Sequence, residues 1–99
     1  MLGGLTQDEY QFLVDEIKTP LEKAGARLWL FGSRARGDHK PFSDVDLLVE
    51  GRLLDGSLIG KLQETAENSN FPYKIDLVLD DELADAYRSN VEVDKVLFN

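Results

Sequence analysis

An α/β (α+β) fold, a small mixed β-sheet with helices packed against it, is the architecture that this sequence of 99 residues predicts. Three apolar runs have the length of strands, at residues 28–31, 45–50 and 74–79, and two amphipathic stretches have helical spacing. The order helix, strand, strand, helix, strand, helix is typical of a sheet covered by helices. With 42% hydrophobic residues the chain can bury one ordinary core, so we expect residues 1–99 to form a single domain.

The first helix is expected to begin at a capping box, Thr6-Gln7-Asp8-Glu9, whose side chains can satisfy free amide donors. The apolar residues that follow at helical spacing form a stripe for the core: Tyr10, Leu13, Val14, Ile17 and Leu21. Pro20 lacks an amide hydrogen and is expected to kink or end the helix near Thr19. Gly25 is the expected terminator.

A short apolar strand over residues 28–31 leads directly into a Gly32-Ser33 turn. Trp29 and Phe31 of this strand are expected to belong to the core. A helical turn over residues 34–36, closed by Gly37, and a polar loop over 38–42 follow. In the strand 45–50 the alternation places three apolar residues on the face opposite Asp44 and Asp46, namely Val45, Leu47 and Val49.

The second half begins with an expected turn over residues 53–56 and an amphipathic helix over 57–68. The apolar side of this helix is formed by Leu58, Ile59, Leu62 and Ala66. In the strand 74–79, alternation puts Asp76 on the face opposite the core. Residues 80–89 are predicted to form a short helix with acids at its start, where they complement the helix dipole. The tail 91–98 is expected to add an edge strand or to pack on the core.

The charge balance is strongly acidic, with 11 basic against 19 acidic residues and a net charge of -8. Such a surface repels polyanions, so DNA and RNA are unlikely partners and a basic protein surface is a better one. The chain has no cysteine, which excludes disulfides and zinc-thiolate sites. Neither a leader nor an apolar run of membrane-spanning length is evident, so we expect a soluble cytoplasmic protein.

The candidate site is formed by three carboxylates and one turn. Asp44 and Asp46 are two residues apart, so on a strand they point to the same face and can converge on one cation. The Gly32-Ser33 turn offers backbone amides, and Asp76 on another strand would supply a third carboxylate. Hard anionic oxygens beside a turn of this kind suit a divalent metal that carries a phosphate.

Other interpretations of these residues remain open at this stage. Asp44 and Asp46 could be solubilising acids at a strand edge, and Asp76 an ordinary acid on an outer strand face. Arg36 could contact a triphosphate or form a structural ion pair, which we favour. Ser43 could support the turn or the surroundings of a metal. Arg34 is expected to be exposed, and Phe42 and Tyr73 are candidates to flank a nucleobase.

The string Gly32-Ser33-x-Ala35-Arg36-Gly37-x5-Ser43-Asp44-x-Asp46-Leu47-x-Val49 resembles the signature of the polymerase-beta-like nucleotidyltransferases, in particular their minimal bacterial and archaeal branch, the MNT proteins. The resemblance implies the fold of that superfamily over the whole chain. It also implies that Gly32 and Ser33 hold the β- and γ-phosphates of a nucleoside triphosphate, with Arg36 and Ser43 as further nucleotide-binding candidates. The metal ligands and catalytic residues that it implies, for two magnesium ions, are Asp44, Asp46 and Asp76.

By the same resemblance the chain would transfer a nucleoside monophosphate, AMP from ATP, to a hydroxyl group. Minimal members commonly serve as antitoxins of HEPN-domain RNase toxins, and some attach AMP to a tyrosine of the toxin, as in type VII-like systems. Ninety-nine residues leave no room for an acceptor domain, so a homo- or hetero-oligomer is expected. Two alternatives are a non-catalytic antitoxin that acts by binding and an enzyme that modifies a small molecule such as an aminoglycoside.

Overall fold

The structure is a computed structural model that describes residues 2–51 and 56–98. Within this part of the chain, four strands form one sheet in the order β3-β2-β1-β4. β1 pairs antiparallel with β2 and β4, whereas β2 and β3 are parallel, so the sheet is mixed as predicted. The strands are β1 (Arg27–Phe31), β2 (Val45–Glu50), β3 (Ile75–Leu79) and β4 (Val96–Leu97).

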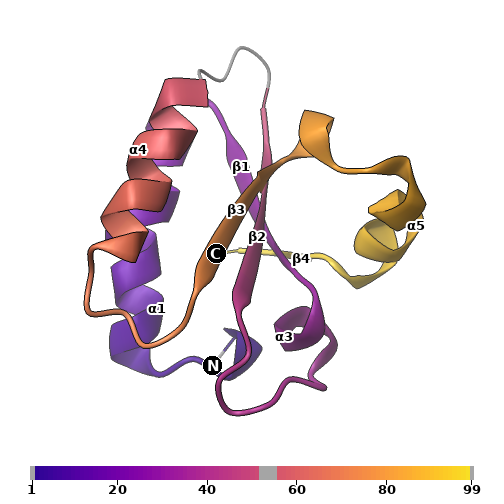
Figure 1. Ribbon diagram of the computed structural model, residues 1–99, viewed down its shortest axis with the longest axis horizontal. Helices are drawn as coiled ribbons and strands as arrows, with labels where there is room; N and C mark the ends of the chain where they lie inside the picture. Colours follow the sequence, from indigo (N-terminus) through magenta and orange to yellow (C-terminus); the bar gives the residue numbers. More distant parts are fainter. Residues whose placement is uncertain (1, 52–55, 99) are drawn as a thin grey trace.

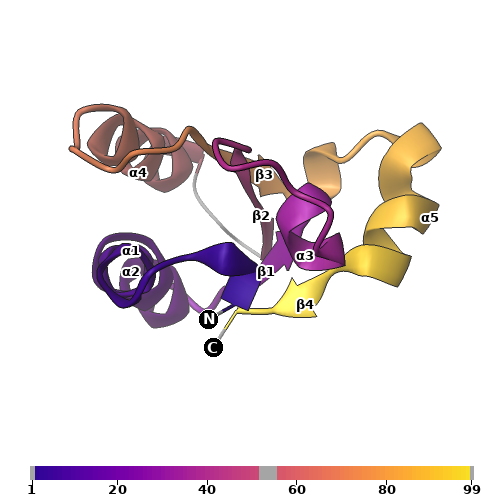
Figure 2. The same cartoon turned by 90° about the horizontal axis from the view of Figure 1, so that it is seen from below.

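Helices lie on both sides of this sheet (Figures 1 and 2). On one side are α1 (Gln7–Leu13), α2 (Thr19–Lys23) and α4 (Gly56–Glu67). On the other side are α3 (Ser33–Arg36) and α5 (Asp85–Asp94), together with a 3₁₀ turn at Asp80–Glu82. None of the described helices is long and apolar enough to cross a membrane.

The N-terminal helix begins at the predicted capping box but does not end at Pro20. Glu9 N–H donates to Thr6 Oγ1 at 3.1 Å, and Thr6 N–H donates to Glu9 Oε1 at 2.8 Å. A π-helical segment, Val14–Lys18, joins α1 to α2, and Pro20 lies in the first turn of α2. Of the two outcomes predicted near Thr19, a kink or an end of the helix, the end is therefore wrong. The wider turn accommodates the missing amide hydrogen, and the chain stays helical to Lys23.

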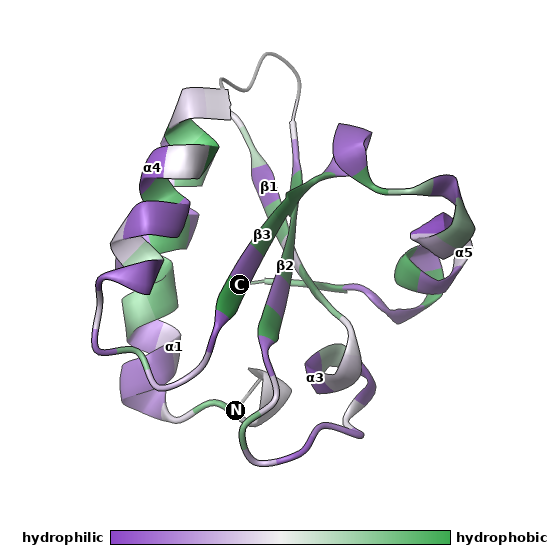
Figure 3. Cartoon of the chain, in the orientation of Figure 1, coloured by the Kyte–Doolittle hydropathy of each residue, from purple (hydrophilic) through white to green (hydrophobic). Residues whose placement is uncertain are grey.

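The main core lies between the sheet and α1, α2 and α4. Its fully buried members alternate along the strands and follow helical spacing on the helices: Leu13, Ile17, Leu21, Leu30, Val45, Leu47 and Val49. Phe98 closes this core, with its ring stacked on Tyr10 and its N–H bonded to the Leu28 carbonyl at 2.9 Å. Figure 3 shows that the hydrophobic colour along β2 and β3 is interrupted by polar segments, which belong to the opposite face.

Trp29 and Phe31 are not part of this core, contrary to the prediction. Strand alternation buries Leu28 and Leu30 beneath the helices and turns Trp29 and Phe31, both half-buried, to the other face. The ring of Trp29 contacts Lys95 Nζ at 4.4 Å from its centroid. The face that carries the acids is therefore partly lined with aromatic side chains.

The C-terminal third also differs from the prediction. The expected helix over 80–89 is split into the 3₁₀ turn at Asp80–Glu82 and α5, because Leu83 and Ala84 are extended. The guanidinium group of Arg88 donates to the carbonyls of Asp80 and Leu83, which fixes the break. The tail then does both things expected of it, since Val96–Leu97 pairs with β1 and Phe98 enters the core. The turn predicted over 53–56 lies largely outside the described residues.

Candidate functional site

Two of the predicted carboxylates are neighbours across the sheet. The parallel register of β2 and β3 pairs Asp46 with Asp76, and both side chains are on the face opposite the main core. Paired residues on adjacent strands lie roughly 5 Å apart and point the same way. The register therefore brings two acids, 30 positions apart in the sequence, to one place on the sheet.

The Gly32 turn lies directly against one of these acids. β1 ends at Phe31, which is paired with Asp46, so the next residue passes the Asp46 side chain. Gly32 has φ 76° and ψ -158°, a conformation that favours glycine. A Cβ atom at this position would lie 2.5 Å from Asp46 Oδ2. Glycine at this position therefore allows the turn and leaves space for the Asp46 carboxylate.

The charge of Asp46 is poorly compensated by the protein. Burial is the main cause that raises the pKa of Asp46, and the charges of Asp76 and Asp44 raise it further. Lys74 and Arg36 oppose this shift. The three acids therefore interact electrostatically at one site, where a bound cation would lower their mutual repulsion.

Asp44 is less closely associated with the site than Asp46 and Asp76, which are paired across the sheet. Asp44 precedes β2 and is exposed. Among residues 2–51 and 56–98, no three His, Cys, Asp or Glu side chains are arranged as a metal site. The donor set nevertheless fits magnesium, which is usually bound by one or two carboxylates plus phosphate and water oxygens. Asp46 and Asp76 could hold such an ion.

A cavity of about 370 Å³ opens in front of these two carboxylates. Its sheet side includes Gly32, Asp46, Asp76 and Val78, and α5 forms the facing wall. The residues contributed by α5 and the segment before it are Leu83, Tyr87, Asn90, Val91 and Asp94. None of them was predicted as a site residue: Leu83 and Tyr87 lie within the predicted helix 80–89, and the other three lie beyond its end. The i, i+3, i+4, i+7 spacing from Tyr87 to Asp94 is the signal that could have found this wall.

Arg36 lines the same cavity and is bound by two acids. Its Nε donates to Asp38 at 3.2 Å and its Nη1 to Asp94 at 3.3 Å, which ties α3 to the end of α5. These two hydrogen bonds, the one from Asp38 first, raise the pKa of Arg36 above its ordinary value. The ion pair that we favoured for Arg36 is present, and a contact with nucleotide stays a prediction.

Arg34 is buried rather than exposed, which corrects the expectation for this residue. Only 3% of it is accessible. Its Nε donates to the Ser43 carbonyl at 3.0 Å and its Nη1 to the Gly3 carbonyl at 2.8 Å, while its guanidinium carbon lies 4.2 Å from the centroid of the Tyr73 ring. Ser43 in turn accepts a hydrogen bond from the Lys40 amide. Arg34 thus holds the chain immediately before Asp44.

Arg34→Lys should lower the free energy of unfolding by about 1 to 2 kcal/mol, because one ammonium group cannot serve both carbonyls and stack on Tyr73. Urea denaturation, followed by the fluorescence of Trp29, measures this. Arg27→Lys is the matched control on an exposed arginine and should stay within about 0.5 kcal/mol of wild type. Equal effects of the two substitutions would contradict the role assigned to Arg34.

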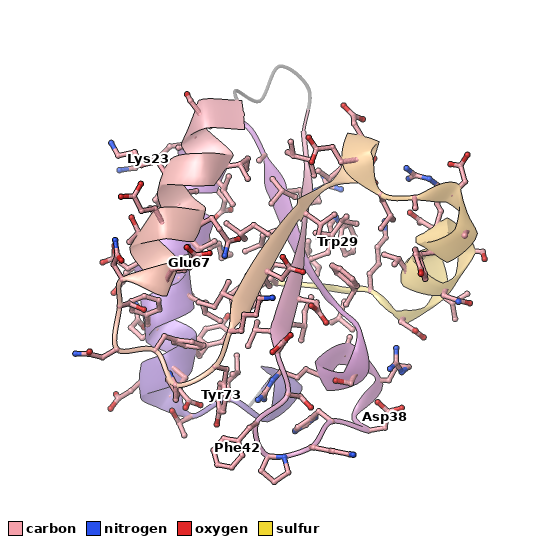
Figure 4. The ribbon with its side chains drawn as sticks, viewed as in Figure 1. Lys23, Trp29, Asp38, Phe42, Glu67 and Tyr73 are labelled. Carbon is pink, nitrogen blue, oxygen red and sulfur yellow. The ribbon has the colours of Figure 1, made fainter. Side chains whose placement is uncertain are left out.

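The remaining predicted residues lie outside the cavity. Ser33 is the first residue of α3 and, like Ser43, does not line it. Phe42 is 83% exposed, and Tyr73 packs edge-on against Phe71. In Figure 4, Phe42 and Tyr73 lie near one another at the lower edge of the molecule, away from α5. Neither side chain is placed to flank a nucleobase in this cavity.

Comparison with known proteins extends over most of the chain. Residues 13–98 match the family model of the nucleotidyltransferase domain. The chain is 36% identical over 52 residues to a Haemophilus influenzae protein named "Probable protein adenylyltransferase MntA", which is 52% of this chain and 46% of the relative. The chain therefore spans about half the length of this curated relative.

One solved structure is similar in fold. A chain from a crystal structure of a toxin-antitoxin with AMP-PNP aligns with a TM-score of 0.64 and 21% sequence identity. The alignment covers 96% of this chain and 73% of that chain. At this level of identity the likeness concerns the fold, which agrees with the mixed sheet and flanking helices predicted from the sequence.

Proposed function

The chain belongs to the nucleotidyltransferase domain family, and we propose that residues 1–99 form one minimal domain that transfers AMP from ATP to a hydroxyl group of a partner protein. The observation that carries this proposal is the pairing of Asp46 with Asp76 beside Gly32, at one end of a cavity. Two acids side by side, Asp46 half-buried and Asp76 exposed, repel each other, and a metal–triphosphate substrate gives a reason for their position.

In this proposal Asp44, Asp46 and Asp76 are the residues that would hold two magnesium ions. When bound, magnesium would supply Lewis-acid stabilisation of the negative charge of the triphosphate. Gly32 lines the cavity and would let the phosphates approach the backbone, and the backbone amide of Ser33, the next residue, would be available to them. Arg36 and Ser43 act around this centre, Arg36 at the rim of the cavity and Ser43 through the turn before Asp44.

The reaction is a substitution at the α-phosphorus. The acceptor oxygen forms a bond to this phosphorus, and the bond from phosphorus to the pyrophosphate oxygen breaks, so pyrophosphate leaves with the electron pair. Asp76 is exposed on β3 and takes the proton of the acceptor hydroxyl. The products are the AMP ester of the acceptor and pyrophosphate.

We further propose that the acceptor is a tyrosine of a toxin, of the HEPN RNase class, and that the two proteins form a cytoplasmic complex. The relative is named as a protein adenylyltransferase and the structural neighbour is a toxin-antitoxin with AMP-PNP. A net charge of -8 suits a basic RNase surface. The family resemblance supplies the HEPN class and the tyrosine.

Intact-mass spectrometry tests this proposal. The protein is incubated with ATP, magnesium and the product of the neighbouring gene, and the expected result is an increment of one or more AMP groups on that partner. Peptide sequencing then identifies the modified residue. A stable complex with no change in mass would favour neutralisation by binding alone, and the absence of any complex would favour a small-molecule acceptor.

A further inference from the structure

We propose that the α5 wall of the cavity binds the nucleobase of the substrate, with Tyr87 stacking on the base and Asn90 selecting adenine. The inference rests on the proposed function, because it assigns a place to the base of the same nucleotide. It adds a specificity-determining residue that neither the sequence motif nor the comparisons identify.

The face that α5 turns toward the cavity is unusual for a helix beside a sheet. Tyr87, Asn90, Val91 and Asp94 follow i, i+3, i+4, i+7 spacing, so they share one face. Such a face normally carries apolar residues that pack on the sheet. Here only Val91 is buried, while Tyr87 is 64% exposed. This face of α5 therefore lines an open cavity and does not pack tightly against the sheet.

This wall is fixed at both ends of the helix. Asp94, the last residue of α5, is bound by Arg36 at 3.3 Å. Near the start of the helix, Arg88 of α5 binds the preceding segment, at 3.2 Å to the Asp80 carboxylate and 2.9 Å to the Asp80 carbonyl. Val91 anchors the middle. These contacts fix the position of α5, so Tyr87 and Asn90 project from a rigid element, as a binding site requires.

Along β3 the lining of the cavity changes from a carboxylate to an apolar side chain, as a nucleotide changes from its phosphates to its base. Asp46 and Asp76 line the part of the cavity where the metal and phosphates would be, together with Phe31, the partner of Asp46 on β1. Val78 follows Asp76 on the same face of β3, about 7 Å further along the strand, and Leu83 and Tyr87 continue this apolar side. A ribose between the phosphates and the base would span this change, placing the base between Val78 and Tyr87.

Asn90 is the polar group on this apolar side. Its side chain makes no hydrogen bond or ion pair within the described residues, and it lines the cavity. A primary amide has a donor and an acceptor side by side, which match the exocyclic amine and ring nitrogen of adenine. Guanine offers two acceptors at the corresponding edge and matches an arginine or lysine better. Asn90 thus favours ATP over GTP.

The test measures dissociation constants for ATP, GTP and inorganic tripolyphosphate, each with magnesium, by isothermal titration calorimetry on the whole chain. Tyr87→Ala should weaken ATP and GTP binding roughly tenfold, whereas Tyr87→Phe, which keeps the ring, should bind as wild type. Asn90→Ala should reduce the preference for ATP over GTP by roughly tenfold. Tripolyphosphate has no base, so its affinity should be unchanged in all these variants.

Ser89→Ala is the matched control, because Ser89 is an exposed residue of α5 that does not line the cavity. Far-UV circular dichroism checks that α5 is intact in each variant. Unchanged ATP affinity in Tyr87→Ala, with tripolyphosphate binding intact, would overturn the nucleobase site and leave the proposed function standing. If the wild type bound neither ATP nor tripolyphosphate, the proposed function itself would fail.

Discussion

Asp46→Asn should reduce nucleotide transfer by at least about a hundredfold while leaving the protein folded. Asp46 is the acid that the structure places most centrally, paired with Asp76 across the strands and packed against Gly32. The amide keeps the shape of the side chain but removes the negative charge that would hold the metal–triphosphate complex. Transfer of radiolabelled AMP to the partner protein measures the loss.

The same substitution should not lower the free energy of unfolding at neutral pH, although Asp46 is a half-buried strand residue. Burial raises the pKa of Asp46 above its ordinary value of 3.8, and Asp76 and Asp44 raise it further. As the pH rises, the carboxyl of Asp46 therefore loses its proton at a lower pH in the unfolded chain than in the folded protein. The free energy of unfolding consequently falls between about pH 4 and the raised pKa. Asparagine cannot ionise and escapes this penalty. Asp46→Asn should be at least as stable as wild type at pH 7.

The control is Asp81→Asn, which makes the same change of charge at an exposed acid outside the cavity. It should leave both transfer and melting temperature near the wild-type values. Retention of full transfer by Asp46→Asn would refute the proposed metal site. Loss of transfer together with a large loss of stability would instead mark Asp46 as a structural residue.

The site strands could be predicted from the sequence because their patterns are local. In β2 the alternation of Val45, Leu47 and Val49 with the acids fixes both the bounds and the buried face, and all three are fully buried. Asp76 was assigned to the correct face of β3 by the same reasoning. The parallel register that places it beside Asp46 depends on the path of the connecting chain, and no local pattern contains that information.

The errors in the prediction arise from interactions between distant residues. Pro20 is tolerated because Leu21 beyond it is buried, so packing favours continuing the helix through a π-helical segment. Arg34 looked like an exposed charge, and only the carbonyls of Gly3 and Ser43 explain its burial. Likewise α5 could not be bounded from its sequence alone, since Arg88 fixes its start.

Gly32→Ala should cause a loss of transfer that its effect on stability does not explain. The backbone of Gly32 is in a region that other residues seldom adopt, and the cost of forcing alanine into it is about 2 to 3 kcal/mol. The added Cβ also meets Asp46 Oδ2, the mobile end of a side chain. The carboxylate can rotate away at little cost in stability, but it then leaves the place beside Asp76 that the metal needs.

Gly37→Ala provides the matched comparison for this argument. Gly37 also has positive φ, at 85°, but no atom lies within 4 Å of a Cβ built there. Its substitution should cost about 1 kcal/mol of left-handed strain and leave transfer largely intact. Urea denaturation and initial rates of AMP transfer, measured at a temperature where both variants are folded, separate the two effects. If both variants lost transfer in proportion to stability, Gly32 would be a turn residue only, and the room it leaves for Asp46 would have no part in the reaction.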